Sequence, residues 1–517
     1  MGDLSGRSVP ATGTGVRLGG LRLRALPVWL VPTGVTLIVT LAGLDAAQPW
    51  RDELATWSAA TRPVTALLRL ALTIDAATVP YYLLMHAWIA VVGDSVAALR
   101  LPSALAMAAA AGLTAGLGQR LAGTSVGTLA GLLFAVLPGT SRYAQEARPY
   151  ALATALAVLS TLLLVDALRR PGWGRWAGYA AASTALGLLH VIALTLLAAH
   201  AVAVLGAAAR PDRREPDRRQ PDRREPDGRQ PDQRQPVRWW PVRWWLGALL
   251  PVTLAVTPLA LLAAGQRRRQ LDWVDAARPA DLAALPGGVT QSGVVGGVLV
   301  GLAALGLIRA GRWALLPASC VLLPVSLLFL TGLVVPLWVP RYLLFVVPFA
   351  CLLAGAALAA ARSPAVLVVV LLAGLLGLPD QVALRRTHEW PRTATVDYRG
   401  AAEIVAAGQR SGDAVVYSPR DGWLLLDLGL RYHLRERTPR DVLLIEDQDR
   451  RGDFWATECD RPAGCLAGTD RVWLLLAGHP RDPLAALPTA KADALRARYR
   501  VTQVWPRPGL TIALLTR

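Results

Sequence analysis

Long uncharged apolar runs fill the first three quarters of the chain. A membrane-spanning helix needs about 20 mainly apolar residues, and segments of this kind recur with only short polar breaks between them. Because lipid offers the backbone no hydrogen bonds, each run is predicted to form a helix. The predicted fold class is therefore a polytopic α-helical membrane protein. The runs are 25–44, 76–93, 101–119, 121–141, 149–165, 176–209, 244–266, 282–308, 313–340, 342–361 and 364–379.

Arginine-rich segments indicate the orientation, because cytoplasmic loops are enriched in Lys and Arg. Four arginines precede the first run and eleven lie in 210–243, so both segments are predicted to be cytoplasmic. Because both segments are on the same side, the number of membrane crossings between them must be even. If 176–209 is a hairpin of two helices, one of the five earlier runs therefore cannot cross the membrane. The run 76–93 is short and carries Tyr, His and Trp, which suit an interface. We therefore expect it to lie on the outer surface, with eleven spans, an inner N-terminus and an outer C-terminus. In the alternative, 176–209 is one tilted span and 142–148 lies inside.

The composition changes after Pro379, where polar helices begin to alternate with short β-rich segments. We predict a cytoplasmic tail at 1–24, a transmembrane domain at 25–379 and a small extracytoplasmic α/β domain at 380–517. The α/β domain has a helix at 400–409 and strands at 414–417, 441–445, 471–476, 501–505 and 510–515.

Two further features refine this organisation. The segment 210–243 contains Pro-Asp-Arg repeats of period five, which match neither helix nor strand and predict a solvated cytoplasmic loop. Cys459 and Cys465 are predicted to form a local disulfide in the oxidising outer setting, with two free thiols as the alternative. Cys320 and Cys351 lie in predicted spans and are expected to be packing residues.

Composition and charge narrow the function classes. The chain has 517 residues, of which 54% are hydrophobic and 17% charged, whereas soluble domains carry about 25% charged residues. A net charge of +18 is typical of nucleic-acid binding, but the apolar excess favours a membrane, so no nucleic-acid partner is expected. No P-loop or strand-linked G-x-G-x-x-G supports an ATP-driven pump. The histidines lack ligand spacing, and no metal site is predicted.

Polar clusters at the predicted outer ends of spans carry the candidate chemistry. Asp52 and Glu53 are adjacent carboxylates that can act as a general base, a metal ligand or a helix cap. Arginines suit bidentate phosphate binding, and several face these acids from other outer loops. An acid beside an arginine-lined phosphate site suits glycosyl transfer from a lipid phosphate. The other members of these clusters are Arg142, Glu146, Arg148, Tyr150, Arg268, Trp273, Arg341 and Tyr342.

The ordered motifs resemble those of the protein O-mannosyltransferase-like (family 39) branch of the GT-C glycosyltransferases, in its bacterial, actinobacterial form. The resemblance covers most of the chain outside 210–243. It implies a GT-C-like fold and an inverting hexosyltransferase of the plasma membrane that uses a polyprenyl-phosphate sugar, often mannose, on the outer face. The motifs are DE at 52–53, DA…YYLLMHAW at 75–88, RLPSAL at 100–105, YAQEARPYAL at 143–152, PRYLL at 340–344 and DYRGAAE at 397–403.

The resemblance also implies roles for single residues. Asp52 would be the base and Glu53 would assist it. Relatives carry His-Pro or Lys-Pro-Pro before the Tyr-Tyr pair, so at 75–80 this chain lacks that phosphate contact or metal ligand. Arg142, Arg148, Arg268 and Arg341 are the candidates for donor-phosphate binding. Contacts to the acceptor or sugar are expected from Tyr81, Glu146, Tyr150, Trp273 and Tyr342.

The expected partners are the lipid donor, membrane lipid and a glycan, lipid or protein acceptor. No cofactor is firmly predicted, and a divalent cation (Mg or Mn) stays open. Two other functions remain as alternatives, namely a lipid or polysaccharide transporter and an inactive relative whose outer domain binds an envelope partner.

Overall fold

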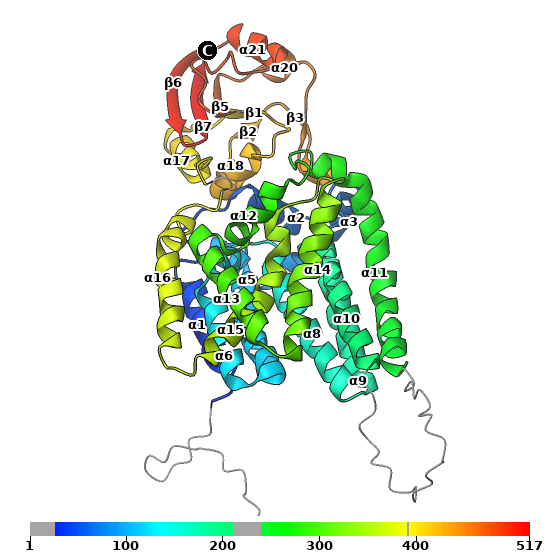
Figure 1. Ribbon diagram of the computed structural model, residues 1–517. Helices are drawn as coiled ribbons and strands as arrows, with labels where there is room; N and C mark the ends of the chain where they lie inside the picture. The colour runs from blue at the N-terminus through cyan, green and yellow to red at the C-terminus, as the bar shows by residue number, and fades with distance from the viewer. Residues whose placement is uncertain (1–25, 210–238, 390–391) are drawn as a thin grey trace, which may run out of the picture.

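The computed structural model describes residues 26–209, 239–389 and 392–517, which form a helical bundle carrying an α/β domain at one end (Figure 1). Every predicted membrane span corresponds to a helix of the bundle. The run 176–209 is a hairpin, α9 and α10, joined at His190 and a short 3₁₀ helix, which excludes the alternative of one tilted span. The bundle helices are α1 (Leu30–Leu41), α5 (Val96–Ala122), α6 (Thr124–Val136), α8 (Tyr150–Arg169), α9 (Trp173–Leu189), α10 (Leu196–Ala208), α11 (Trp240–Gln270), α13 (Gly293–Arg309), α14 (Leu315–Gly332), α15 (Val347–Ala360) and α16 (Val366–Leu384).

The lengths of these helices agree with a polytopic membrane protein. Within the described ranges, seven helices are long and apolar enough to cross a membrane alone, or nine if each of two bent pairs counts as one span. The predicted total of eleven also includes α1 and α9, which have 12 and 17 residues. The predicted fold class, a polytopic helical protein with a small C-terminal α/β domain, is confirmed.

Two predicted single spans are broken. The run 121–141 divides into α6 and α7 (Pro138–Ala144), bent by 65°, because Pro138 has no N–H to continue the α6 hydrogen bonds. The run 282–308 divides into α12 (Pro279–Thr290) and α13, bent by 101°. There Gln291 adopts a left-handed conformation and Ser292 caps α13 through the backbone N–H of Val295.

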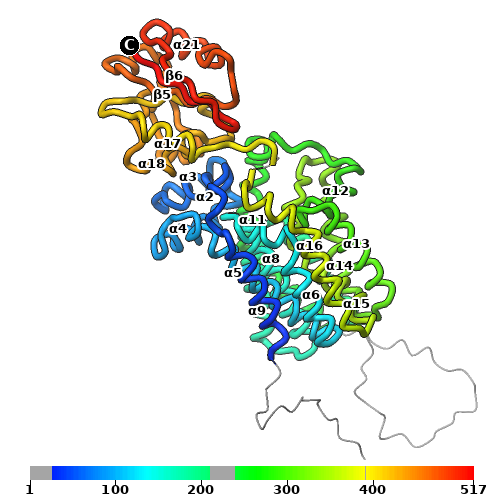
Figure 2. Tube along the Cα trace, turned by 90° about the vertical axis from the view of Figure 1, so that its left-hand side faces the viewer, coloured from blue at the N-terminus to red at the C-terminus, as the bar shows by residue number. Residues whose placement is uncertain are grey.

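Three short helices lie between the bundle and the α/β domain (Figure 2). They are α2 (Arg51–Ala60), α3 (Val64–Thr73) and α4 (Val79–Val92). Helix α4 is the predicted surface helix 76–93, and it packs mainly on α2 and α3, with fewer contacts to the bundle helices α5 and α9. Its position on the outer membrane surface is still a prediction, and its location between the bundle and the α/β domain agrees with it.

The C-terminal domain contains a mixed sheet with strand order β2-β1-β5-β7-β6. Strand β1 is parallel to β2 and β5, whereas β7 is antiparallel to β5 and β6. One face packs on α17 (Tyr398–Gly408) and α18 (Leu426–Leu434), and the other on α21 (Thr489–Arg496). The strands are β1 (Ala414–Ser418), β2 (Arg440–Asp441), β5 (Arg471–Ala477), β6 (Arg500–Arg507) and β7 (Leu510–Thr516).

Three details of this domain concern the sequence predictions. The predicted strand 441–445 is instead two short strands, because β3 (Leu444–Glu446) turns away to pair with β4 (Thr457–Glu458). Helix α16 continues past the predicted boundary at 379 to Leu384. The structure joins Cys459 and Cys465 in a disulfide.

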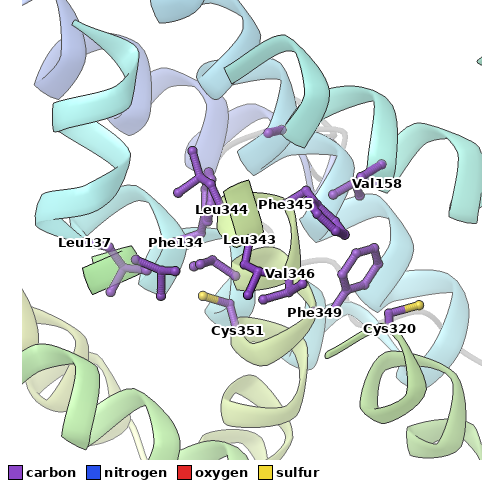
Figure 3. Packing of buried hydrophobic residues seen from close by; sticks show 14 of the residues in the cluster. Phe134, Leu137, Val158, Cys320, Leu343, Leu344, Phe345, Val346, Phe349 and Cys351 are labelled. Carbon is purple, nitrogen blue, oxygen red and sulfur yellow. The ribbon is translucent and has the colours of Figure 1, made fainter. Parts of the chain in front are cut away.

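The interior of the bundle is apolar. Side chains of the 3₁₀ segment η3 (Pro340–Val346) and of α15 pack against α6 and α8, with Phe345 and Phe349 nearly fully buried (Figure 3). The free thiols of Cys320 and Cys351 are buried in the same cluster, which confirms their predicted packing role.

The α/β domain is docked on the bundle through a second apolar cluster that includes Leu67 and Tyr82 from the short helices and Phe454 from the domain. Two ion pairs flank this contact. Arg62 lies 2.9 Å from Asp449, and Arg269 at the end of α11 lies 2.5 Å from Asp453. The start of α1, the end of α10 and the start of α11 lie at the opposite end of the bundle (Figure 1). The predicted cytoplasmic segments 1–24 and 210–243 lie almost wholly outside the described residues, but the described residues next to them are at one end of the bundle and the α/β domain occupies the other.

Candidate active site

A cavity of about 770 Å³ lies where the bundle meets the α/β domain. Its walls come from α2, the α3–α4 turn, the α7–α8 bend, the junction of α9 with the 3₁₀ helix η1 (Val191–Thr195), α11 and η3. Its roof comes from the α/β domain through Ala394, Trp423, Leu425 and Phe454. Segments that are far apart in the sequence therefore meet here. The sequence-predicted residues that line the cavity are Asp52, Arg148, Tyr150, Trp273, Arg341 and Tyr342.

Asp52 lies in the first turn of α2, where the helix dipole favours a negative charge. Its side chain is 21% exposed, and its Oδ2 lies 3.5 Å from Nη2 of Arg341. Within the described residues, Oδ2 accepts no hydrogen bond. The Asp52 side chain thus lines the cavity, and its buried Oδ2 has a free acceptor position beside Arg341.

Arg341 is held at the start of η3 among aromatic rings. Its guanidinium carbon lies 5.8, 6.0 and 5.5 Å from the ring centres of Trp50, Tyr150 and Trp273. Cation–π contacts of this kind fix the plane of a guanidinium without using its N–H groups. Arg341 is therefore positioned and still has donors for an anion.

Arg148 occupies the bend between α7 and α8, on the cavity wall. Its Nη1 donates to Tyr82 Oη at 3.2 Å, and Tyr82 donates to Asp75 Oδ2 at 2.7 Å. Asp75 also accepts a hydrogen bond from Gln270 at 2.5 Å, and burial raises its pKa although Arg148 opposes the change. Arg148 is thus tied to one carboxylate of the cavity and keeps Nε without a partner among the described residues.

Glu53 does not line the cavity. Its carboxylate is 1% exposed and forms a two-point contact with Arg100, at 2.8 and 2.7 Å. It also accepts from the backbone N–H of Ala147 at 2.9 Å, which ties α2 to the α7–α8 bend. Burial alone would raise the pKa of Glu53, but the charge and hydrogen bonds of Arg100 outweigh it and hold the pKa well below its usual range.

His388 completes this buried cluster. Its Nδ1 lies 3.7 Å from Glu53. Burial, together with the charges of Arg142 and Arg100, lowers the pKa of His388 to about 3, so the imidazole is neutral and does not form an ion pair with Glu53.

The other predicted residues lie behind the cavity or outside it. Glu146 is fully buried and pairs with Arg142 at 3.0 Å, and Arg142 donates to the carbonyl of His388 at 2.7 Å. Tyr81 is fully buried, whereas its neighbour Tyr82 reaches the cavity. Arg268 is exposed and its neighbour Arg267 lines the wall.

Several cavity residues were not selected from the sequence. Some belong to the quoted motifs or lie close to predicted residues, namely Asp75, Tyr82 and Gln270, but other residues of the same segments were selected as site candidates. Successive helical residues point about 100° apart, so the motif located the segment without giving the direction of each side chain. Glu389 does not line the cavity but is buried close to Asp52 and Arg51, and it had no sequence signal.

The lower wall of the cavity is apolar. Ala260, Ala263 and Ala264 present small side chains from α11, and Val191 and Val335 face the same space. The cavity thus combines charged side chains from α2, the α7–α8 bend and η3 with an apolar surface from α11. Among the described residues, no three His, Cys, Asp or Glu side chains gather as metal ligands. Asp52 and Asp75 are the carboxylates in the wall from which a divalent cation could be held.

Two solved structures share this fold. ArnT from Cupriavidus metallidurans bound to undecaprenyl phosphate is 12% identical, with a TM-score of 0.57 over 95% of this chain and 98% of that chain. The apo state of ArnT from Cupriavidus metallidurans is also 12% identical, with a TM-score of 0.58 over 94% and 97%. The protein therefore has the fold of a GT-C membrane glycosyltransferase.

Sequence comparison adds one match. The family described as dolichyl-phosphate-mannose-protein mannosyltransferase matches residues 58–214, less than a third of the chain. The matched segment includes Arg100 and Arg148 and begins after Asp52. No curated protein matches the sequence.

Proposed function

We propose that the protein is a membrane glycosyltransferase that moves a sugar from a polyprenyl phosphate to an extracytoplasmic acceptor. The observation that carries this proposal is the cavity itself, where Asp52, Arg148 and Arg341 converge above an apolar wall. Such a cavity can take both the charged and the isoprenoid part of a lipid phosphate. The GT-C fold and the mannosyltransferase family match support the same reaction class.

The proposed chemistry assigns one role to each group. Asp52 takes the proton of an acceptor hydroxyl, whose oxygen attacks the anomeric carbon as the bond to the phosphate oxygen breaks. Attack opposite the leaving phosphate inverts the anomeric configuration. Arg341 and Arg148 stabilise the charge that develops on the departing polyprenyl phosphate. The sugar is mannose by the resemblance stated above.

The proposed setting follows from the positions of the arginine-rich segments. We place the protein in the plasma membrane, with the N-terminus cytoplasmic and the α/β domain and the cavity on the outer side. A lipid donor reaches such a cavity from within the bilayer, which suits the apolar wall on α11.

The test uses the full chain in lipid nanodiscs with polyprenyl-phosphate [¹⁴C]mannose and an envelope extract as acceptor. We expect Asp52→Asn to lower turnover by about 10²–10⁴-fold, which is the usual contribution of general-base catalysis. Asp272→Asn is the matched control because Asp272 is exposed and does not line the cavity. Full transfer by Asp52→Asn would remove Asp52 from the mechanism.

The arginines are tested separately, with donor concentration varied. Arg341→Gln and Arg148→Gln should raise the donor KM or lower kcat by at least tenfold, whereas Arg268→Gln, outside the cavity, should change neither. Movement of intact donor across a vesicle membrane without transfer would favour a transporter. Donor binding with neither transfer nor movement would favour an inactive relative.

A further inference from the structure

The α/β domain has a cavity of its own, which we name the β1–β5 cavity. It encloses about 600 Å³ and is lined by Ser418 at the end of β1 and by Leu476 and Ala477 at the end of β5. These strands are parallel neighbours. In open α/β sheets, ligands bind outside the carboxyl ends of parallel strands, because the loops that follow them diverge there.

Charged side chains with unused hydrogen-bonding capacity face this space. Arg420, whose side chain is 8% exposed, lies 2.6 Å from Asp441, and Glu458 pairs with Lys491, the only lysine of the chain. Among the described residues, no hydrogen-bond partner exists for Arg420 Nε or Glu458 Oε1, both from lining residues, nor for Oδ1 of Asp441, which pairs with Arg420 but does not itself line the cavity. Buried polar groups are normally satisfied, so both donors and acceptors are left for a ligand.

The chemistry of these groups defines the ligand class. A phosphate would satisfy the guanidinium but be repelled by the carboxylates, and a lone ammonium would satisfy only the carboxylates. Adjacent hydroxyl groups can donate to Glu458 while they accept from Arg420. The rest of the lining includes Ala477, Ala485, Leu487 and Pro488, an apolar surface that can cover the C–H face of a sugar ring.

One loop connects this cavity with the candidate active site. Segment 418–425 begins with Ser418 in the lining of the β1–β5 cavity and ends with Trp423 and Leu425 in the roof of the active-site cavity. The loop is held by Tyr398, which donates to the Leu424 carbonyl, and by Trp455, which donates to the Gly422 carbonyl. A ligand in the β1–β5 cavity therefore contacts the same short segment that roofs the reaction site.

We propose that the β1–β5 cavity binds a sugar unit, and that this unit belongs to a glycan acceptor whose other end enters the active-site cavity. Sugar binding follows from the cavity alone, whereas its assignment to the acceptor rests on the proposed function. The closing experiment therefore measures binding without turnover.

Binding is measured by saturation-transfer NMR on the full chain in nanodiscs. The probes are methyl α-D-mannopyranoside, methyl α-D-glucopyranoside and methyl α-D-arabinofuranoside. We expect saturation transfer to at least one probe, and we expect Ala485→Trp, which fills the mouth of the cavity, to reduce that signal at least fivefold. Ala490→Trp is the matched control, because Ala490 is exposed on α21 and lies outside the cavity. Equal signals from the two tryptophan variants, or none with any probe, would overturn the proposal.

Two more variants separate the possible failures. Glu458→Gln removes a carboxylate without changing volume and should weaken the same signal severalfold, so the test survives if Ala485→Trp does not fold. Asp52→Asn should leave saturation transfer unchanged while it lowers sugar transfer by about 10²–10⁴-fold. If Asp52→Asn keeps full transfer but Ala485→Trp loses binding, the proposed function fails and the sugar site stands.

Discussion

Asp52 and Glu53 are consecutive residues with opposite surroundings. Asp52 faces the cavity with a free acceptor position, whereas Glu53 is sealed against Arg100 and the Ala147 backbone. A helix turns about 100° per residue, which is enough to place one carboxylate in the cavity and the next in the protein interior. We therefore assign chemistry to Asp52 and a positioning role to Glu53, which holds the α7–α8 bend and with it Arg148.

This division predicts different consequences for the two carboxylates. Glu53→Gln should lower the free energy of unfolding by about 3–5 kcal/mol, because Arg100 is left buried without a counter-charge. Asp52→Asn should leave unfolding nearly unchanged. Thermal unfolding in detergent, followed by intrinsic tryptophan fluorescence, distinguishes them. Equal unfolding midpoints for both variants would contradict the positioning role.

Glu389 predicts a pH dependence of stability. Burial, with a smaller effect from Asp52, raises the pKa of this side chain to about 7 against the opposing charge of Arg51. A carboxyl with a raised pKa stabilises the fold while it is protonated. This contribution is complete below about pH 4.5 and is lost as the pH rises through 7, by up to about 3 kcal/mol. Glu389→Gln should remove the loss between pH 5 and 8 in unfolding midpoints, whereas Glu403→Gln, remote on α17, should retain it.

The sequence predicted the segments that form the site more accurately than it predicted which side chains of those segments enter the cavity. The motifs at 52–53, 143–152 and 340–344 do contribute Asp52, Arg148 and Arg341 to one cavity. Within each motif, however, direction depends on helix phase and on partners from distant segments. Glu53 faces the protein interior because its carboxylate pairs with Arg100 there, and no local sequence pattern indicates that contact.

At the scale of elements, the two helix breaks contact each other. A Cβ on Gly139 of α7 would lie 2.3 Å from the carbonyl oxygen of Val289 in α12. The apolar pattern predicted the helices on both sides of each break but not the bends, since an apolar run is the same whether straight or broken. Pro138 was the local signal for one break. The other depends on the left-handed Gln291, which the sequence does not require.

This close approach predicts that Gly139→Ala destabilises the protein by about 1–3 kcal/mol, because a backbone carbonyl cannot move aside as a side chain can. Gly293→Ala is the control, since Gly293 starts α13 with no atom near its Cβ position. This variant should be neutral or stabilising by about 0.4–1 kcal/mol. Thermal unfolding compares the two, and a stable Gly139→Ala variant would show that the breaks are not packed together.

At the scale of the whole molecule, the bundle separates two ends of different character. The α/β domain and both cavities described above occupy one end, and the described residues next to the segments predicted to be cytoplasmic lie at the other. The alternation of helices and strands predicted the domain, and arginine positions predicted its side of the membrane. Docking through Arg62–Asp449 and Arg269–Asp453 could not be predicted, because each pair joins residues more than 180 positions apart.

The orientation is testable with single cysteines. A membrane-impermeant maleimide should label Arg481→Cys, on the exposed surface of the α/β domain, in intact cells. It should label Arg170→Cys, between α8 and α9, only after permeabilisation. The native cysteines give a low background, since two are buried and two are in a disulfide. The reverse labelling pattern would place the active-site cavity in the cytoplasm.

Helix α11 has 31 residues and is about 46 Å long, and its uncharged apolar run 244–266 alone is about 35 Å long, against a hydrocarbon thickness of about 30 Å. It packs mainly on α9, while its far end carries Arg267 and Gln270 into the cavity wall and Arg269 to the α/β domain. A helix longer than the bilayer adjusts to hydrophobic mismatch by tilting. A thinner membrane therefore requires a larger tilt of α11, which moves the wall that we propose holds the donor, so the proposed sugar transfer should depend on lipid chain length.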